Sequence, residues 1–91
     1  MTEKYVNIDC SMIATKTDLH SVLREAIGSS DYVGNNLDAL YDVLTSVKGL
    51  QLNFENFSIL SDKLGDYYDR LVKVIVAASN NNPDLKVTIS Y

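Results

Sequence analysis

The sequence predicts an α/β domain in which four helices pack in a second layer against a three-stranded parallel sheet. Three short segments alternate apolar and polar residues, as strands with one buried face do. The segments between them carry apolar residues at helical spacing, and helical crossovers of this length join parallel strands right-handedly. Strands covered on both faces would read as continuous apolar runs. We therefore expect the helices mainly on one face of the sheet.

We expect the first strand over residues 4–10, with Cys10 as a small core residue rather than a nucleophile. The first helix has Thr17 as its N-cap and ends at Gly28, which adopts a left-handed conformation at little cost. Its core face consists of Leu19, Val22, Leu23, Ala26 and Ile27. His20, the only histidine, is expected on the polar side of this helix, at the surface or in a local hydrogen bond.

A loop of small polar residues, 29–36, leads into a second helix. Asn35 or Asn36 can cap this helix. Gly34 can adopt a positive φ, leave room for a partner's backbone, or do both. The core face of the second helix consists of Leu37, Leu40, Val43, Leu44 and Val47. Gly49 is expected to end it.

The second half of the chain repeats the order of strand, two helices and strand. Leu50, Leu52 and Phe54 alternate with polar residues as the second strand. A brief third helix is capped by Asn56 and closed by Gly65. The fourth helix, 66–79, has a broad apolar surface and ends at the breaker segment 80–83. The last strand alternates Leu85, Val87, Ile89 and Tyr91 with polar residues.

Length and charge limit the possible functions. Ninety-one residues make one domain, expected over residues 1–91. Eight Lys and Arg against twelve Asp and Glu give a net charge of −4, which favours a basic partner and argues against binding nucleic acid. One cysteine cannot form an internal disulfide, no signal peptide opens the chain, and no apolar run approaches the roughly 20 residues of a membrane span. We expect a cytoplasmic protein that does not bind a membrane.

Residues 31–47 carry the clearest candidate for a binding surface. Asp38 and Asp42 lie four residues apart on the polar side of the second helix, where like charges disfavour a helix by about 0.2–0.5 kcal/mol. The helix dipole stabilises Asp38 in the first turn, but Asp42 lies a turn further in and gains little. The fold does not need this pair, so it indicates either a site for a cationic partner or a solvated acidic face.

The stretch DYVGNNLDALYDVLT closely resembles the corresponding stretch of the barstar family, whose founding member is the intracellular inhibitor of the secreted ribonuclease barnase. Asp18, Leu19 and His20 lie upstream at the spacing that a barstar has. Elsewhere the similarity is mainly one of pattern and length. The resemblance implies four helices against a three-stranded parallel sheet, in agreement with the pattern of the whole chain.

The resemblance also implies a partner-binding set on the loop and the second helix: Tyr32, Gly34, Asn36, Asp38, Tyr41, Asp42 and Thr45. Asp42 matches the aspartate that enters the enzyme's phosphate site and pairs with several cations, and Asp38 matches a second acidic contact. Tyr32 matches an aromatic residue that packs near the enzyme's catalytic histidine. The polar or close backbone contacts fall on Asn36, Gly34 and Thr45, while Tyr41 replaces a tryptophan.

Two contacts of the family are absent from this chain. Val47 stands where the family has a second tryptophan, and Ala77 aligns approximately with a glutamate that adds an outlying contact. These departures indicate that the cognate enzyme can differ from barnase.

The chain lacks the common signatures of catalysis. It holds neither GxGxxG nor GxxxxGKS/T, and neither HExxH nor CxxC. Two aspartates at helical spacing fall short of the six or more oxygens that a hard cation prefers. Three strands are too few for a phosphoacceptor receiver domain. We therefore expect no enzyme activity, no metal ion and no cofactor.

The predicted function is inhibition of a small basic ribonuclease of extracellular or toxin type, by an immunity or antitoxin protein that blocks the active site with its acidic helix and preceding loop. We expect a monomer that forms a 1:1 complex, against either a self-made or a competitor's toxin. The alternative is a barstar-like binding module or regulator whose basic protein partner is not a nuclease.

Overall fold

The computed structural model describes residues 4–29 and 32–91. The sheet is built from β1 (Lys4–Asp9), β2 (Leu50–Glu55) and β3 (Leu85–Ile89), in the order β1-β2-β3 with both pairs parallel. The first crossover contains a 3₁₀ turn η1 (Cys10–Met12), α1 (Lys16–Ile27) and α2 (Leu37–Ser46). The second contains α3 (Ile59–Leu64) and α4 (Asp66–Asn81). The predicted architecture, a three-stranded parallel sheet with four helices, is confirmed.

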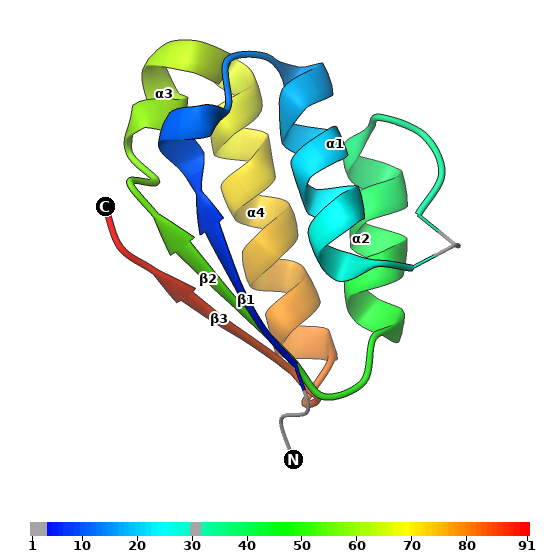
Figure 1. Cartoon of the computed structure of the whole chain (residues 1–91). Coiled ribbons are helices and arrows are strands. Elements are labelled where there is room, and N and C mark those ends of the chain that lie inside the picture. Colours follow the sequence, from blue (N-terminus) through cyan, green and yellow to red (C-terminus); the bar gives the residue numbers. More distant parts are fainter. Residues whose placement is uncertain (1–3, 30–31) are drawn as a thin grey trace.

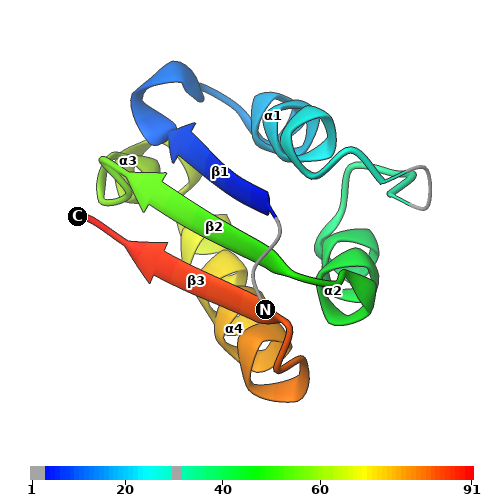
Figure 2. The ribbon, with the colours of Figure 1, turned by 60° about the horizontal axis from the view of Figure 1, so that its bottom comes forward.

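The helices lie on one side of the sheet and leave its other face uncovered (Figure 1 and Figure 2). In β2, Leu50, Leu52 and Phe54 are buried against the helices, whereas the residues between them are more exposed. On the open face, Asn53 Nδ2 donates to Asn7 Oδ1 at 3.0 Å, across the β1–β2 pair. The predicted alternation therefore separates a core face from a polar face.

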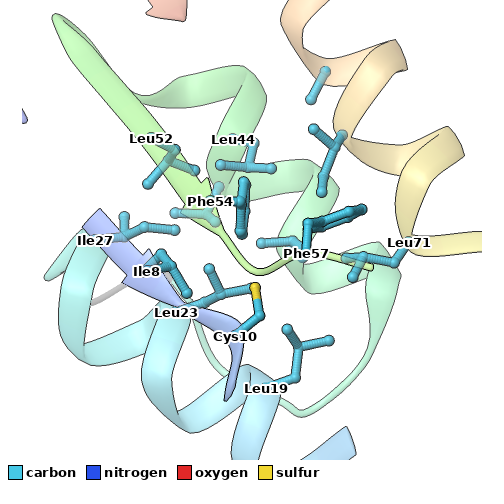
Figure 3. Packing of buried hydrophobic residues seen from close by; sticks show 14 of the residues in the cluster. Ile8, Cys10, Leu19, Leu23, Ile27, Leu44, Leu52, Phe54, Phe57 and Leu71 are labelled. Atoms are coloured by element: carbon cyan, nitrogen blue, oxygen red, sulfur yellow. The ribbon is translucent and has the colours of Figure 1, made fainter. Parts of the chain in front are cut away.

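One hydrophobic core fills the space between the sheet and the helices (Figure 3). The rings of Phe54 and Phe57 pack edge to face at its centre, with centroids 5.3 Å apart. Cys10 lies among these side chains with no exposed surface, and its thiol is free. Burial, together with the nearby Asp9 charge, raises the pKa of the Cys10 thiol to about 11. Cys10 is thus the small core residue that the sequence predicts.

The start of α1 differs from the prediction. Thr15, not Thr17, is the N-cap, because its Oγ1 accepts a hydrogen bond from the Asp18 backbone N–H at 3.1 Å. Asp18 in turn accepts from the Ala14 backbone N–H at 3.1 Å, so the entry into the helix is held from both sides. Gly28 ends the helix in the left-handed region at φ 70°, as predicted.

Two further helix boundaries are corrected. α2 ends at Ser46, and Gly49, at φ 61°, shapes the turn into β2 instead of closing the helix. Asn56 does not cap α3. Its own φ is 56°, its Nδ2 donates to Asp9 Oδ1 at 3.1 Å, and Ser58 occupies the N-cap position. Gly65 closes α3 as predicted.

α4 continues to Asn81, two residues beyond its predicted end. Its buried stripe consists of Tyr67, Leu71, Ile75 and Ala78, while Val76 on the outer side is 48% exposed. Tyr91 lies beyond β3 and is largely exposed. None of the helices in the described part of the chain has the length and apolar character needed to cross a membrane.

Candidate protein-binding surface

α2 lies at the outer edge of the helical layer, where it packs against α4 (Figure 1). Its core face is the predicted one, with Leu40, Val43 and Leu44 buried. Asp38 and Asp42 are both exposed on the opposite side. Across residues 4–29 and 32–91, neither carboxylate takes part in an ion pair. Both charges are therefore accessible to cations of another molecule.

Asn36 fixes the start of α2. Its backbone is extended, at φ −145° and ψ 164°, and its Oδ1 accepts from the Ala39 backbone N–H at 2.8 Å. This bond satisfies one of the N–H groups that lack a partner in the first turn of any helix. Of the two predicted caps, Asn36 is therefore the one used.

Arg24 of α1 holds the loop that precedes α2. Its Nε donates to the carbonyl oxygen of Tyr32 at 2.9 Å, and its Nη2 donates to the carbonyl oxygen of Gly34 at 3.0 Å. The same Nη2 donates to Asn35 Oδ1 at 2.8 Å. The guanidinium also lies 4.9 Å from the centroid of the Tyr32 ring. One side chain thus fixes the course of the loop through residues 32–35.

Gly34 adopts a positive φ, which is one of the two roles that the sequence predicts for it. Its φ is 98°, and a Cβ at this position would lie 3.1 Å from Asn36 Nδ2. A side chain here would therefore strain the backbone and crowd the cap of α2. Gly34 is also exposed, so its backbone remains open to close approach.

His20 is fully buried, and the prediction of a surface or locally bonded histidine is wrong. Its Nδ1 lies 2.5 Å from the Tyr32 hydroxyl oxygen, and its Nε2 lies 2.6 Å from the Tyr67 hydroxyl oxygen. Burial, and secondly the Arg24 charge, lower the pKa of His20, so the imidazole is neutral at pH 7. One ring nitrogen donates and the other accepts. This bridge ties α1, the loop and α4 together.

Tyr32 lies beneath the surface and not on it. The side chain is 1% exposed, with its hydroxyl against His20 and its ring beside Arg24. Burial raises the pKa of the Tyr32 phenol. In this structure the ring supports the loop from within, and the contact of Tyr32 with a partner stays a prediction.

Tyr41 and Thr45 lie half-buried at the margin of α2. The Tyr41 hydroxyl accepts from Asn81 Nδ2 at 2.9 Å, which joins α2 to the end of α4. Thr45 Oγ1 lies 2.9 Å from the Tyr41 carbonyl oxygen and 3.1 Å from that of Asp42. The Thr45 hydroxyl thus donates to its own helix, and its oxygen can still accept a hydrogen bond from outside.

Asn82, a residue that the sequence pattern does not single out, holds the other end of α2. Its Nδ2 donates to the carbonyl oxygens of Leu44 and Val47, at 2.9 and 2.8 Å. Its Oδ1 accepts from the Asp84 backbone N–H at 3.0 Å, and the residue is 5% exposed. The last carbonyls of a helix lack intrahelical donors, so Asn82 acts as their cap from a distant segment.

The two positions at which this chain departs from the contacts of the family are both half-buried. Val47 and Ala77, which stand in place of two contacts of the family, offer neither an aromatic ring nor a charge at the surface. Within the described ranges, no three His, Cys, Asp or Glu side chains gather in a way that could hold a metal ion.

A sequence model of a family, described as "Barstar (barnase inhibitor)", matches residues 3–90. The chain belongs to the barstar family. A protein of Bacillus subtilis (strain 168) named "Putative ribonuclease inhibitor YrdF" is 38% identical over 68 residues, which cover 72% of this chain and 75% of that protein. The resemblance found in residues 31–47 is therefore confirmed at the level of the family.

In this barstar-family chain, six of the seven predicted contact residues lie exposed or half-buried on one loop and helix. We call this set the α2 surface: Gly34, Asn36, Asp38, Tyr41, Asp42 and Thr45. Tyr32 lies under it, and Asp31 falls outside the described residues. The α2 surface presents two carboxylates beside polar and backbone groups, a combination that can pair with cations and form hydrogen bonds.

Proposed function

We propose that this barstar-family protein inhibits a small basic ribonuclease by placing its α2 surface in the enzyme's active-site cleft, as a 1:1 complex in the cytoplasm. The observation that carries the proposal is the exposed pair of Asp38 and Asp42, which no cation of the described chain neutralises. An enzyme that binds RNA phosphates must line its cleft with Arg, Lys or His side chains. Asp42 would stand in for a phosphate of the substrate, and Asp38 would pair with a neighbouring cation.

Charge complementarity sets the size of the expected effect. Close, desolvated charge pairs in the barnase–barstar complex, the founding pair of this family, couple by about 1.5–7 kcal/mol, and we adopt that measured range as the scale for the α2 surface. The net charge of −4 adds long-range attraction to a basic partner. The α2 surface therefore supports both a tight and a rapidly formed complex.

The surface is also held in place before it meets a partner. Asn36 caps the start of α2, Asn82 caps its end, and Arg24 fixes the loop. A surface that is already ordered loses little conformational entropy on binding, so more of the interaction free energy appears as affinity.

A fluorogenic RNA cleavage assay tests the proposal. Each member of a panel of small basic microbial ribonucleases is titrated with the wild-type chain, with Asp42→Ala and with Asp62→Ala. Asp62 is an exposed aspartate of α3, away from α2, so its variant loses the same charge elsewhere. We expect activity to fall linearly to zero at about one equivalent of wild type or Asp62→Ala, and Asp42→Ala to inhibit far less.

The alternative function is a binding module or regulator whose basic partner is not a nuclease. It is favoured by Val47 and Ala77, where two contacts of the family are replaced by small or aliphatic side chains. If no ribonuclease in the panel is inhibited, and affinity purification from the native source returns a basic protein without RNA-cleaving activity, the alternative replaces the inhibitor proposal.

A further inference from the structure

An open groove of about 380 Å³ lies directly beside the α2 surface. Asn36 and Asp38 form its wall on the α2 side, while Lys16, Tyr67 and Arg70 line it from α1 and α4. These three helices begin at the same end of the molecule (Figure 1), and the lining residues lie at or near their first turns. We call this groove the Lys16–Arg70 groove. Because Asn36 and Asp38 belong to both the groove and the α2 surface, a molecule docked on that surface would meet the groove.

Two cations share one aromatic ring in this groove. Lys16 Nζ lies 5.0 Å from the centroid of the Tyr67 ring, and Arg70 Cζ lies 5.2 Å from it. The two positive charges are therefore within about 10 Å of each other. Both residues are exposed, and among the ion pairs of the described chain neither has an acidic partner.

The Tyr67 ring that both cations approach is held in place by a hydrogen bond at its hydroxyl end. The hydroxyl of Tyr67 lies 2.6 Å from His20 Nε2, and the residue is 9% exposed. Lys16 and Arg70 thus lie beside an aromatic ring whose position is fixed, at the rim of the groove. The ring electrons attract each cation, while the two like charges repel each other. An anion placed between Lys16 and Arg70 would relieve that repulsion.

We propose that the Lys16–Arg70 groove receives a carboxylate side chain of the protein partner. This inference rests on the proposed function and adds a specificity element to it. Asp38, on the same wall, draws a partner cation toward α2, while Lys16 and Arg70 draw an acidic residue into the groove. The fitting partner carries a carboxylate next to the basic residues of its cleft. A uniformly basic surface is disfavoured, because it would face two unneutralised cations.

Nuclear magnetic resonance measures binding to the groove in the absence of a ribonuclease. The folded chain is titrated with acetyl-Glu-Glu-amide, and we expect the largest shift changes at Lys16, Tyr67 and Arg70. The variant Lys16→Gln/Arg70→Gln should lose them. The matched control Lys63→Gln/Lys86→Gln removes two charges from α3 and the open sheet face, and should keep them. Absent shifts, or equal shifts in both variants, would overturn the proposal.

A short RNA of matched charge provides the second arm of the titration. If the RNA perturbs the groove at lower concentration than the acidic peptide, the groove binds nucleic acid, and the carboxylate assignment is wrong. Thermal unfolding of both double variants shows whether they are folded. All four substituted side chains are exposed, and we expect native-like transitions.

The third arm uses the ribonuclease that the wild type inhibits. The Lys16→Gln/Arg70→Gln variant should dissociate from it about tenfold faster than the control variant does, as expected for the loss of two exposed charge pairs. Equal dissociation rates would overturn the groove proposal and leave the inhibitor proposal intact. Peptide binding to the groove, with no ribonuclease inhibited by the wild type, would overturn the inhibitor proposal and leave the binding of a carboxylate in the groove intact.

Discussion

His20 of α1 joins its helix to two other segments that support the α2 surface, the loop before α2 and the start of α4. It lies between the hydroxyls of Tyr32 and Tyr67, so that both ring nitrogens are satisfied although the imidazole is fully buried. A buried polar group without partners is costly, and a complete network is rigid. The charged and titratable groups that face His20 are the two tyrosines and Arg24, and Arg24 disfavours the imidazolium.

The stability of the protein should depend on pH through His20. Its pKa is lowered from an ordinary 6.5 by burial first and by Arg24 second, so the unfolded chain binds a proton more readily than the folded one. The contribution of His20 to the free energy of unfolding is fully present above pH 6.5. It falls as the pH drops toward the pKa of the folded state, by at most about 1.4 kcal/mol per pH unit. Urea unfolding between pH 7.5 and 5.5 measures this, and His20→Gln should remove most of the slope. Equal slopes in both proteins would contradict the assignment.

α2 illustrates how an element is held by residues outside its own sequence. Its apolar stripe and its Asn36 cap are local, but the donor to its last carbonyls is Asn82, which lies 38 residues from Leu44 in the chain. Arg24 reaches the loop from α1 in the same way. The acidic helix is thus fixed at both ends and along its inner face.

Asn82→Ala should be clearly destabilising, because it leaves the carbonyl oxygens of Leu44 and Val47 without their donor. The expected loss is about 1–3 kcal/mol, the range for a buried polar group that loses its partner. Asn80→Ala is the matched control, since Asn80 is exposed in the last turn of α4, two residues before Asn82, and its effect should stay within about 0.5 kcal/mol. Urea unfolding of the two variants measures the difference in their stability. Equal midpoints would show that Asn82 is not a cap for α2.

The elements were predictable because their signals are local. Strand alternation and helical spacing predicted the sheet and all four helices, and the stretch around Asp38 and Asp42 predicted the exposed acidic side of α2. The errors involve bonds whose partners cannot be read from neighbouring residues. Asn56 bonds Asp9, 47 residues away, and His20 bonds Tyr67 at the same separation. His20 did precede Leu23 and Ile27 at core spacing, which was the missed signal.

At the scale of the whole molecule, the chain carries an excess of acidic over basic side chains. The formal charge is −4, and both aspartates of the α2 surface are exposed. Opposite long-range fields accelerate the encounter of two proteins, and dissolved salt screens those fields within about 10 Å at 0.1 M. The rate of association is therefore the quantity most sensitive to ionic strength.

Association with an inhibited ribonuclease should slow as salt is raised, while the dissociation rate changes much less. Stopped-flow fluorescence over a series of sodium chloride concentrations measures both rates. Raising the salt from about 0.05 to 0.5 M should lower the association rate by tenfold or more, given the 10- to 1,000-fold range of electrostatic steering. An association rate independent of salt would show that long-range charge plays no part in docking.

Titration calorimetry of Asp42→Asn against an inhibited ribonuclease tests the central claim most directly, because this change removes the charge and keeps the shape of the side chain. The matched control is Asp62→Asn on α3. We expect Asp42→Asn to lose several kcal/mol of binding free energy, within the range of about 1.5–7 kcal/mol for close interface pairs, with folding stability unchanged or slightly raised by relief of the Asp38 repulsion. Unchanged affinity for Asp42→Asn would contradict the claim that the α2 surface is the inhibitory site.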